Sequence, residues 1–187
     1  MSPRYLAVAA LDVEAAYLPS EVPLVITGIG KTSAAVAVSR ALAGLDDLTD
    51  LTVLNVGTAG ALRDGLEGLH EIGTVINHDI SAPSIRALGL DPKERLVLDP
   101  ALPTTLASGD LFVSDPAVRA RLARESHLVD MEGYAVAYAC AEFGVPVRLV
   151  KHVSDNADES AHDWTAAVDG SARALADWVE ALLAEGG

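Results

Sequence analysis

Short apolar runs alternate with helix-forming segments along almost the whole chain, and this alternation restricts the fold more than any other feature. The apolar runs predict strands at Tyr5–Ala10, Leu24–Ile26, Leu51–Val56, Ile72–Asn77, Arg95–Leu98, Thr104–Ala107, His127–Val129 and after Pro146 up to Ser154. The intervening segments predict helices after Ser33 up to Ala43, from Pro116 to Arg124, from Glu132 to Gly144 and from Trp164 to Leu183. The rest of 81–103 is predicted to be loop.

Strands that alternate with helices pair mainly in parallel, because each helix returns the chain to the same end of the sheet. We therefore predict a three-layer α/β/α fold around a central mixed, mainly parallel twisted sheet, in a single domain that spans residues 1–187. Ligands of such sheets bind beyond the carboxyl ends of the strands. The residues that follow the predicted strands, and so fall at this edge, are Glu14, Gly28, Gly57, Phe112, Glu132 and Asp155.

The formal net charge of −14 argues against nucleic acids and anionic membranes as partners, because both attract lysine and arginine. A small ligand suits this charge better. Cys140 is the only cysteine, and His78 and His162 lack metal-ligand spacing, so we expect no metal. No apolar run approaches the roughly 20 residues of a membrane span, and we expect a cytoplasmic protein.

Acidic residues stand at both ends of one helix–strand unit in the C-terminal half. Asp130 and Glu132 flank Met131 and precede an alanine-rich helix, and the strand after that helix leads to Asp155. Carboxylates beside buried elements indicate a site rather than a solvated surface. Asp130 is interpreted as a helix cap or a surface acid and is left out of that site.

Two glycine-rich segments follow predicted strands. The first, Thr27-Gly-Ile-Gly-Lys31, opens a helix, so its backbone N–H groups suit an anion or the polar edge of a ligand, and Gly30 is a candidate contact. It lacks the third glycine of a dinucleotide-binding fingerprint. The second, Gly57-Thr-Ala-Gly60, is predicted to be a tight turn.

Five motifs in this order resemble those of the nucleoside phosphorylase and nucleosidase superfamily, and within it the 5′-methylthioadenosine/S-adenosylhomocysteine nucleosidases. The resemblance covers almost the whole chain. The motifs are Gly28-Ile-Gly-Lys31, Asn55-Val-Gly-Thr-Ala-Gly60, Ser108-Gly-Asp-Leu-Phe112, Asp130-Met-Glu132 and Ser154-Asp-Asn-Ala-Asp158. Each motif is weak alone, but the five together are specific.

The resemblance implies an N-ribosyl hydrolase that cleaves a small purine nucleoside without a cofactor. Asp155 would protonate the purine and Glu14 would activate the attacking water, as acid and base do in inverting glycosidases. Glu132 would bind the ribose hydroxyls. Ser154 would orient the acid, Met131 would lie against the sugar and Phe112 would stack on the base. The backbone of Val113 would read the edge of the base, Thr58 would lie near the water, and Gly57 is a further substrate-binding candidate.

Phosphorolysis is the close alternative. In phosphorylases of this superfamily an arginine precedes the second glycine segment, where this chain has Asn55-Val56. Lys31 and Lys151 are the only cations that we can place nearby, and Lys151 stands where the hydrolases usually carry arginine. Water is therefore the favoured nucleophile. A non-catalytic nucleoside-binding protein is a further alternative, although binding alone would not need all three acids.

Three departures from the family limit what the resemblance implies, and the third of them leaves the 5′ substituent open. The segment between Glu14 and Leu24 is short, Thr58 replaces a serine, and Trp164 follows a sequence unlike the usual apolar lining of the 5′ pocket, which Trp164 itself could close. A futalosine-type nucleoside and a plain purine nucleoside are alternatives to a 5′-thio nucleoside. By analogy with the family we expect a homodimer.

Overall fold

The computed structural model describes the backbone of residues 4–158 and 164–185, and their side chains except those of 164–166. The elements follow in the order β1 (Arg4–Ala9), the 3-10 helix η1 (Asp12–Ala15), β2 (Leu24–Ile26), α1 (Lys31–Ala43), β3 (Leu51–Ala61), β4 (Leu69–Glu71), β5 (Thr74–Asn77), α2 (Ala82–Ala87), β6 (Arg95–Val97), β7 (Thr105–Ser108), α3 (Pro116–Leu122), β8 (Leu128–Asp130), α4 (Gly133–Glu142), β9 (Val147–Asp155) and α5 (Trp164–Glu185).

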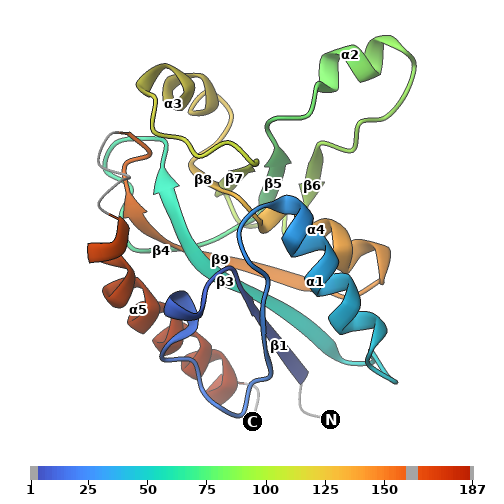
Figure 1. Cartoon of the computed structure of the whole chain (residues 1–187), viewed down its shortest axis with the longest axis vertical. Helices are drawn as coiled ribbons and strands as arrows, with labels where there is room; N and C mark the ends of the chain where they lie inside the picture. Colours follow the sequence, from blue (N-terminus) through green and yellow to red (C-terminus); the bar gives the residue numbers. More distant parts are fainter. Residues whose placement is uncertain (1–3, 159–163, 186–187) are drawn as a thin grey trace.

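Within these described residues, nine strands form one mixed sheet (Figure 1). Most pairs are parallel, as predicted: β1–β2, β1–β3, β3–β9, β5–β7 and β7–β8. The pairs β3–β8, β4–β9 and β5–β6 are antiparallel. Strand β3 pairs with β1, β8 and β9, and so it connects the two halves of the sheet.

Helices cover both faces of the sheet, and strand β1 shows why. Successive side chains of a strand point to opposite faces. Leu6 and Val8 pack in a core cluster with residues of α1 and α4, whereas Ala7 and Ala9 pack in a second cluster with residues of α5. Figure 1 accordingly shows α1 and α4 on one side of β1 and β3 and α5 on the other. The predicted three-layer α/β/α fold is confirmed.

The start of α3 and the end of α4 occur where the sequence predicts them. The Asp115 carboxylate accepts hydrogen bonds from the backbone N–H groups of Ala117 and Val118 and caps α3, whose first residue is Pro116. Gly144, at φ +68°, lies directly after the C-cap of α4. Glycine adopts this left-handed conformation without a steric penalty, so the chain can turn there into β9.

The tight turn predicted at 57–60 is wrong, because β3 continues to Ala61. These residues pair with β9, and the register shifts between Ala59, opposite Val153, and Gly60, opposite Asp155. Glycine is needed here for close packing and not for a turn, because side chains from other segments approach the strand closely. The loop predicted over 81–103 also contains α2, with Pro83 in its first turn, and β4 was not predicted.

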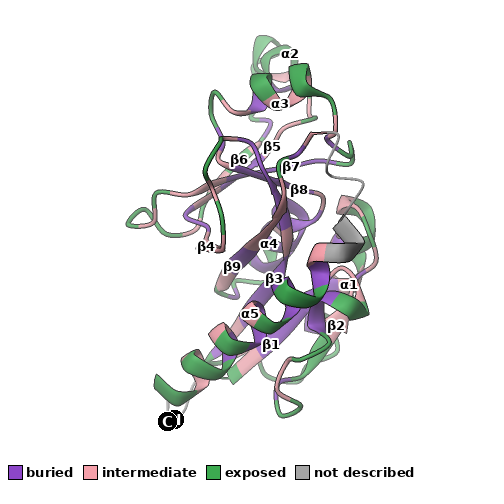
Figure 2. Ribbon diagram, turned by 90° about the vertical axis from the view of Figure 1, so that its left-hand side faces the viewer, coloured by how far each residue is buried: buried purple, intermediate pink, exposed green. Residues whose placement is uncertain are grey.

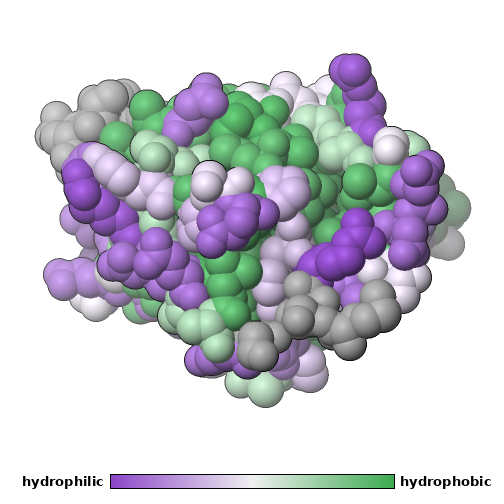
Figure 3. Space-filling model, turned by 90° about the horizontal axis from the view of Figure 1, so that it is seen from below, coloured by the Kyte–Doolittle hydropathy of each residue, from purple (hydrophilic) through white to green (hydrophobic). Residues whose placement is uncertain are grey.

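Buried residues concentrate in the strands, while α5 turns an exposed face outward (Figure 2). The start of β1 and the end of α5 lie at the lower end of the molecule in Figure 1, and Figure 3 shows this end from below, with hydrophilic and hydrophobic residues mixed on its surface. Among the described residues, no helix is both long enough and apolar enough to span a membrane.

Candidate active site

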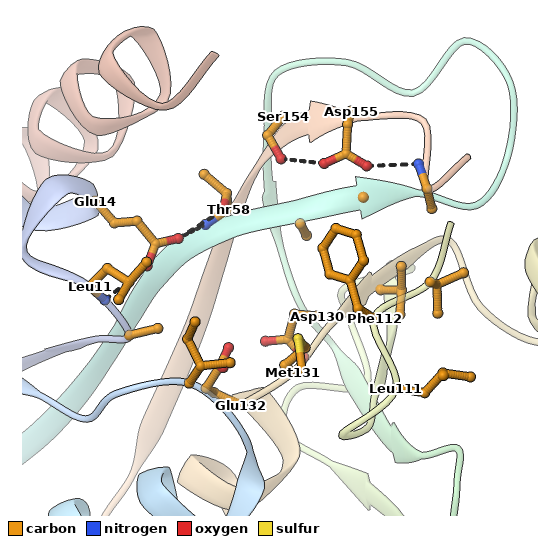
Figure 4. A pocket seen from close by; sticks show the side chains of 17 residues that line it. Leu11, Glu14, Thr58, Leu111, Phe112, Asp130, Met131, Glu132, Ser154 and Asp155 are labelled. Atoms are coloured by element: carbon orange, nitrogen blue, oxygen red, sulfur yellow. Dashed lines mark hydrogen bonds between the residues drawn. The ribbon is translucent and has the colours of Figure 1, made fainter. Parts of the chain in front are cut away.

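A cavity of about 410 Å³ opens where β1, β3, β8 and β9 end (Figure 4). Its position beyond the carboxyl ends of parallel strands is the one that the sequence predicts. Four carboxylates and a set of apolar side chains line it. The lining residues are Ala10, Leu11, Glu14, Ile29, Thr58, Ala59, Gly60, Leu111, Phe112, Val113, Val129, Asp130, Met131, Glu132, Ser154, Asp155 and Ala157.

Glu14 lies in η1, directly after β1, and its side chain is buried. One carboxylate oxygen, Oε1, accepts hydrogen bonds of 2.8 Å from both the backbone N–H and the hydroxyl of Thr58. The other, Oε2, accepts one of 3.2 Å from the backbone N–H of Leu11. These three donors fix the carboxylate at the edge of the cavity.

Asp155 is the last residue of β9, and two donors hold its carboxylate. The Ser154 hydroxyl donates to Oδ2 at 2.7 Å, and the Ala157 backbone N–H donates to Oδ1 at 2.8 Å. The absence of a side chain on Gly60 makes room for this group, because a Cβ there would lie 2.9 Å from Asp155 Oδ1. The predicted contact between Ser154 and the acid is therefore present.

Glu132 immediately precedes α4 and is buried, and its Oε1 accepts a 2.7 Å hydrogen bond from the backbone N–H of Gly30. Burial, followed by the nearby Asp130 carboxylate, raises the pKa of Glu132 to about 7, against the opposing effects of the Gly30 N–H and Lys151. Near neutral pH the Glu132 side chain is therefore partly protonated. Its protonated form can donate a hydrogen bond, whereas its ionised form can only accept them.

Asp130 lines the cavity, and its interpretation as a surface acid is wrong because its side chain is buried. Its Oδ2 accepts a 2.8 Å hydrogen bond from the Gly133 N–H at the start of α4, but the N-cap residue of that helix is Glu132, two residues later. The Ser108 hydroxyl also donates to it, and Lys151 Nζ lies 3.0 Å from Oδ2. Within its own segment the sequence gives no sign of these distant partners.

Lys151, in the middle of β9, is buried and does not line the cavity. Burial lowers the pKa of this lysine, but Asp130 and Glu132 outweigh burial and raise it above its ordinary value. The ammonium group therefore stays charged beneath the cavity. A lysine within an apolar strand is the sequence signal that could have revealed this buried pair.

The remaining predicted residues divide into those that line the cavity and those that support it. Phe112, half exposed, extends into the cavity in Figure 4, and Met131 and Val113 also line it. Gly57 does not, but a Cβ on it would lie 3.3 Å from Glu14 Oε1 and 3.4 Å from Lys151 Nζ. Gly30 acts through its N–H on Glu132.

Trp164 begins α5, and its side chain lies outside the described residues, so the predicted closure of the cavity by this residue is untested. Sequence reasoning missed several apolar lining residues: Ala10, Leu11, Ile29 and Leu111. The sequence signal that could have identified these residues is their position, either next to the end of a predicted strand or beside a predicted site residue. Among the described side chains, no group of three or more histidines, cysteines, aspartates and glutamates has the arrangement of a metal site.

The sequence profile of the Phosphorylase superfamily matches residues 16–184. The chain belongs to this superfamily. Among its curated superfamily relatives, 5′-methylthioadenosine/S-adenosylhomocysteine nucleosidase of Bacillus subtilis is 31% identical over 172 residues, which are 78% of this chain and 73% of the relative. Aminodeoxyfutalosine nucleosidase of Helicobacter pylori is 37% identical over 83 residues, which are 43% of this chain and only 36% of the relative.

Solved structures of the superfamily share the fold. A Helicobacter pylori nucleosidase mutant with 5′-methylthioadenosine in its active site has a TM-score of 0.85 and 21% identity, over 99% of this chain and all of that one. A futalosine hydrolase mutant from the same organism has a TM-score of 0.84, again at 21% identity, over 98% of this chain and 99% of that one. The predicted membership and fold are confirmed.

Proposed function

We propose that the protein is an N-ribosyl hydrolase that releases the base from a small purine nucleoside of the 5′-methylthioadenosine/S-adenosylhomocysteine type. The observation that carries this proposal is the meeting of Glu14, Glu132 and Asp155 around one cavity, although they lie far apart in the chain. The names of the relatives, all nucleosidases, support the same reaction class.

The chemistry divides among the three acids. Cleavage of a purine N-riboside develops positive charge on the sugar and negative charge on the base. Asp155, with Ser154 to orient it, would protonate the purine, and Phe112, Val113 and Leu111 would hold the base. General acid catalysis of this kind typically contributes about 10²–10⁴ in rate.

On the sugar side, an ionised Glu132 would accept hydrogen bonds from the ribose hydroxyls and stabilise the developing positive charge. Met131 would lie against the ribose. Glu14 would take the proton of a water molecule as it attacks the sugar, with Thr58 keeping the carboxylate in place. Acid and base thus act on opposite sides of the bond that breaks.

The charges around the cavity support water rather than phosphate as the nucleophile. Its described lining includes four carboxylates and no lysine, arginine or histidine. A phosphate dianion would need cations there. Lys31 and Lys151 are both engaged with the protein's own aspartates.

Purine release measured with and without added phosphate tests this choice. We expect equal rates, and a strict requirement for phosphate would reject the hydrolase. Asp155→Asn should lower kcat about 10²–10⁴-fold. Asp64→Asn is the matched control, because Asp64 is exposed and lies outside the cavity lining. A wild-type protein that binds nucleosides without turnover would instead favour the non-catalytic alternative.

A futalosine-type nucleoside is the second candidate substrate, because the aminodeoxyfutalosine nucleosidase match reaches 37% identity over 83 residues. Incubation with a panel of 5′-modified purine nucleosides, with chromatography of the released base, separates the two. We expect the 5′-thio nucleosides to react fastest. Preference for a nucleoside whose bulky 5′ substituent is attached through carbon rather than sulfur would move the assignment to the futalosine type.

We also propose a homodimer. The segment that carries α2 projects from the sheet in Figure 1 and exposes Leu88, Leu90 and Val97, apolar side chains that a partner subunit could cover. Light scattering coupled to size-exclusion chromatography should give twice the chain mass. Leu88→Glu should lower that mass, and a monomeric wild-type protein would contradict the proposal.

A further inference from the structure

The start of α1 holds two carboxylates through adjacent backbone N–H groups. The Gly30 N–H donates to Glu132 Oε1, and the Lys31 N–H donates to Asp110 Oδ1, both at 2.7 Å. An exposed helix start had suggested an anion or a polar ligand edge, but the chain's own acids occupy these donors. One helix end therefore contacts both the acid at the ribose side and the segment that leads to Phe112.

The Lys31 side chain adds a second set of contacts around the same point. Its Nζ donates to Asn77 Oδ1 at 2.7 Å, forms an ion pair with Asp79, and lies 3.9 Å from Asp110 Oδ2. The Lys31 side chain is only 18% exposed, so these contacts are partly shielded from water. Asn77 and Asp79 come from the end of β5 and the residues just after it.

Asp79 closes the network, because its second oxygen accepts a 2.7 Å hydrogen bond from the Asp110 backbone N–H. Burial alone would raise the pKa of Asp79, but the hydrogen bonds from Lys31 and the Asp110 N–H outweigh it and lower the pKa. Asp79 is therefore ionised at neutral pH. We call Lys31, Asn77, Asp79 and Asp110 the Lys31 network.

The segment after Asp110 is the part of the cavity wall that the Lys31 network supports. Leu111 and Phe112 line the cavity and are both about half exposed, so only part of each side chain is packed against the protein. Val113 is buried in a core cluster, and Asp115 caps α3. The core thus anchors the C-terminal end of the segment, and the Lys31 network is the anchor at its other end.

We propose that Lys31 and Asp79 are positioning residues that hold Asp110, and through it Leu111 and Phe112, in the conformation that forms the base-binding side of the cavity. The conformational part of this inference is independent of substrate identity, while its kinetic part rests on the proposed function. Neither residue lines the cavity, so their effect on the reaction is indirect.

Hydrogen exchange followed by mass spectrometry tests the conformational part. Lys31→Met should increase exchange at the amides of residues 110–114 in the unliganded protein, and Lys31→Arg, which keeps the charge, should restore protection. Arg95→Met is the matched control, because it removes an equal charge from an exposed ion pair with Glu125. Unchanged exchange in Lys31→Met at residues 110–114 would overturn the proposal, whether or not the protein cleaves nucleosides.

Steady-state kinetics tests the effect on binding. Loss of one charged hydrogen-bonded contact should raise KM for the nucleoside about tenfold in Lys31→Met and in Asp79→Asn. The value of kcat should change much less, because the acids of the cavity stay in place. The double variant should be no worse than the more affected single variant, since both act through one network. An equal loss of kcat in all three variants, or a rise of KM in the double variant that equals the combined effect of the two single changes, would contradict a positioning role.

Discussion

Gly60 of β3 lies against the carboxylate of Asp155, so closely that a Cβ on residue 60 would stand 2.9 Å from Asp155 Oδ1. The same atom would lie 2.9 Å from Ala157 Cβ, in the turn whose backbone N–H holds that carboxylate. A Cβ atom in a folded protein essentially never lies this close to another side chain, so a larger residue at position 60 must displace Asp155, the turn after it, or both.

Gly60→Ala should therefore lower kcat/KM by about 10²-fold or more, because small displacements of a catalytic group have effects of that size. The measurement is purine release at several nucleoside concentrations. Gly170→Ala is the control, since nothing lies within 4 Å of the added Cβ and alanine favours the helix in which it stands. Full activity in Gly60→Ala would show that Asp155 does not need its present position.

The stability of the unliganded protein should depend on pH through Glu132. Its folded pKa of about 7 exceeds the ordinary value of 4.5, so the folded state binds the proton more tightly. The resulting stabilisation is complete below pH 4.5 and is lost as pH rises through 7. Between pH 5 and 8, the unfolding free energy of the wild type should fall relative to that of Glu132→Gln, by on the order of 3 kcal/mol at most.

Urea denaturation of both proteins across this range measures the difference, and the other titrating groups are common to both. Parallel pH profiles would contradict the raised pKa of Glu132. In the wild type, purine release should increase as pH rises through about 7, because an ionised Glu132 stabilises positive charge on the ribose.

Replacement of the buried Lys151 should destabilise the protein. Lys151→Met removes the cation that pairs with Asp130 at 3.0 Å and leaves a buried carboxylate without its charge partner, a change that typically costs about 3–5 kcal/mol. Lys151→Arg keeps the charge and should retain most of the stability. Thermal unfolding measures both, and equal melting temperatures for Lys151→Met and the wild type would refute the role of this ion pair.

The Thr58 hydroxyl should contribute to turnover through Glu14. Thr58→Val removes the hydroxyl donor to Glu14 Oε1 but keeps the backbone N–H donor, and should lower kcat by about tenfold. Thr58→Ser retains a hydroxyl and should stay within about twofold of the wild type, on the same magnitude scale. A valine variant as active as the serine variant would exclude this contact from the mechanism.

Local signals in the sequence were enough to predict much of the fold. The apolar runs at β1, β2 and β9 are bounded by glycine, proline or acids, and the ends of α3 and α4 have recognisable caps. The prediction of a turn at 57–60 is wrong because a glycine that permits a turn and a glycine that permits close approach look the same in sequence. Pairing with β9, a long-range interaction, decided between them.

Some residues of the candidate site can be predicted from the sequence and others cannot, again because long-range interactions decide where the latter lie. Glu14, Glu132 and Asp155 were placed by their positions after strands and by the resemblance, and all three line the cavity. The prediction that Asp130 is a surface acid is wrong because the lysine that pairs with it, Lys151, lies on another strand and is not visible in the local sequence. The Lys31 network joins three segments that are distant in sequence, so no local pattern could reveal it.

The irregular register between β3 and β9 matters for any attempt to transfer the Ser154–Asp155 pair to another protein. In a regular strand neighbouring side chains point to opposite faces, whereas the extra residue opposite Gly60 re-aims one of them. Ser154 can then donate to its own neighbour, Asp155. A designer who copies the serine–aspartate dipeptide onto an unbroken strand of another scaffold should obtain the residues without their hydrogen bond.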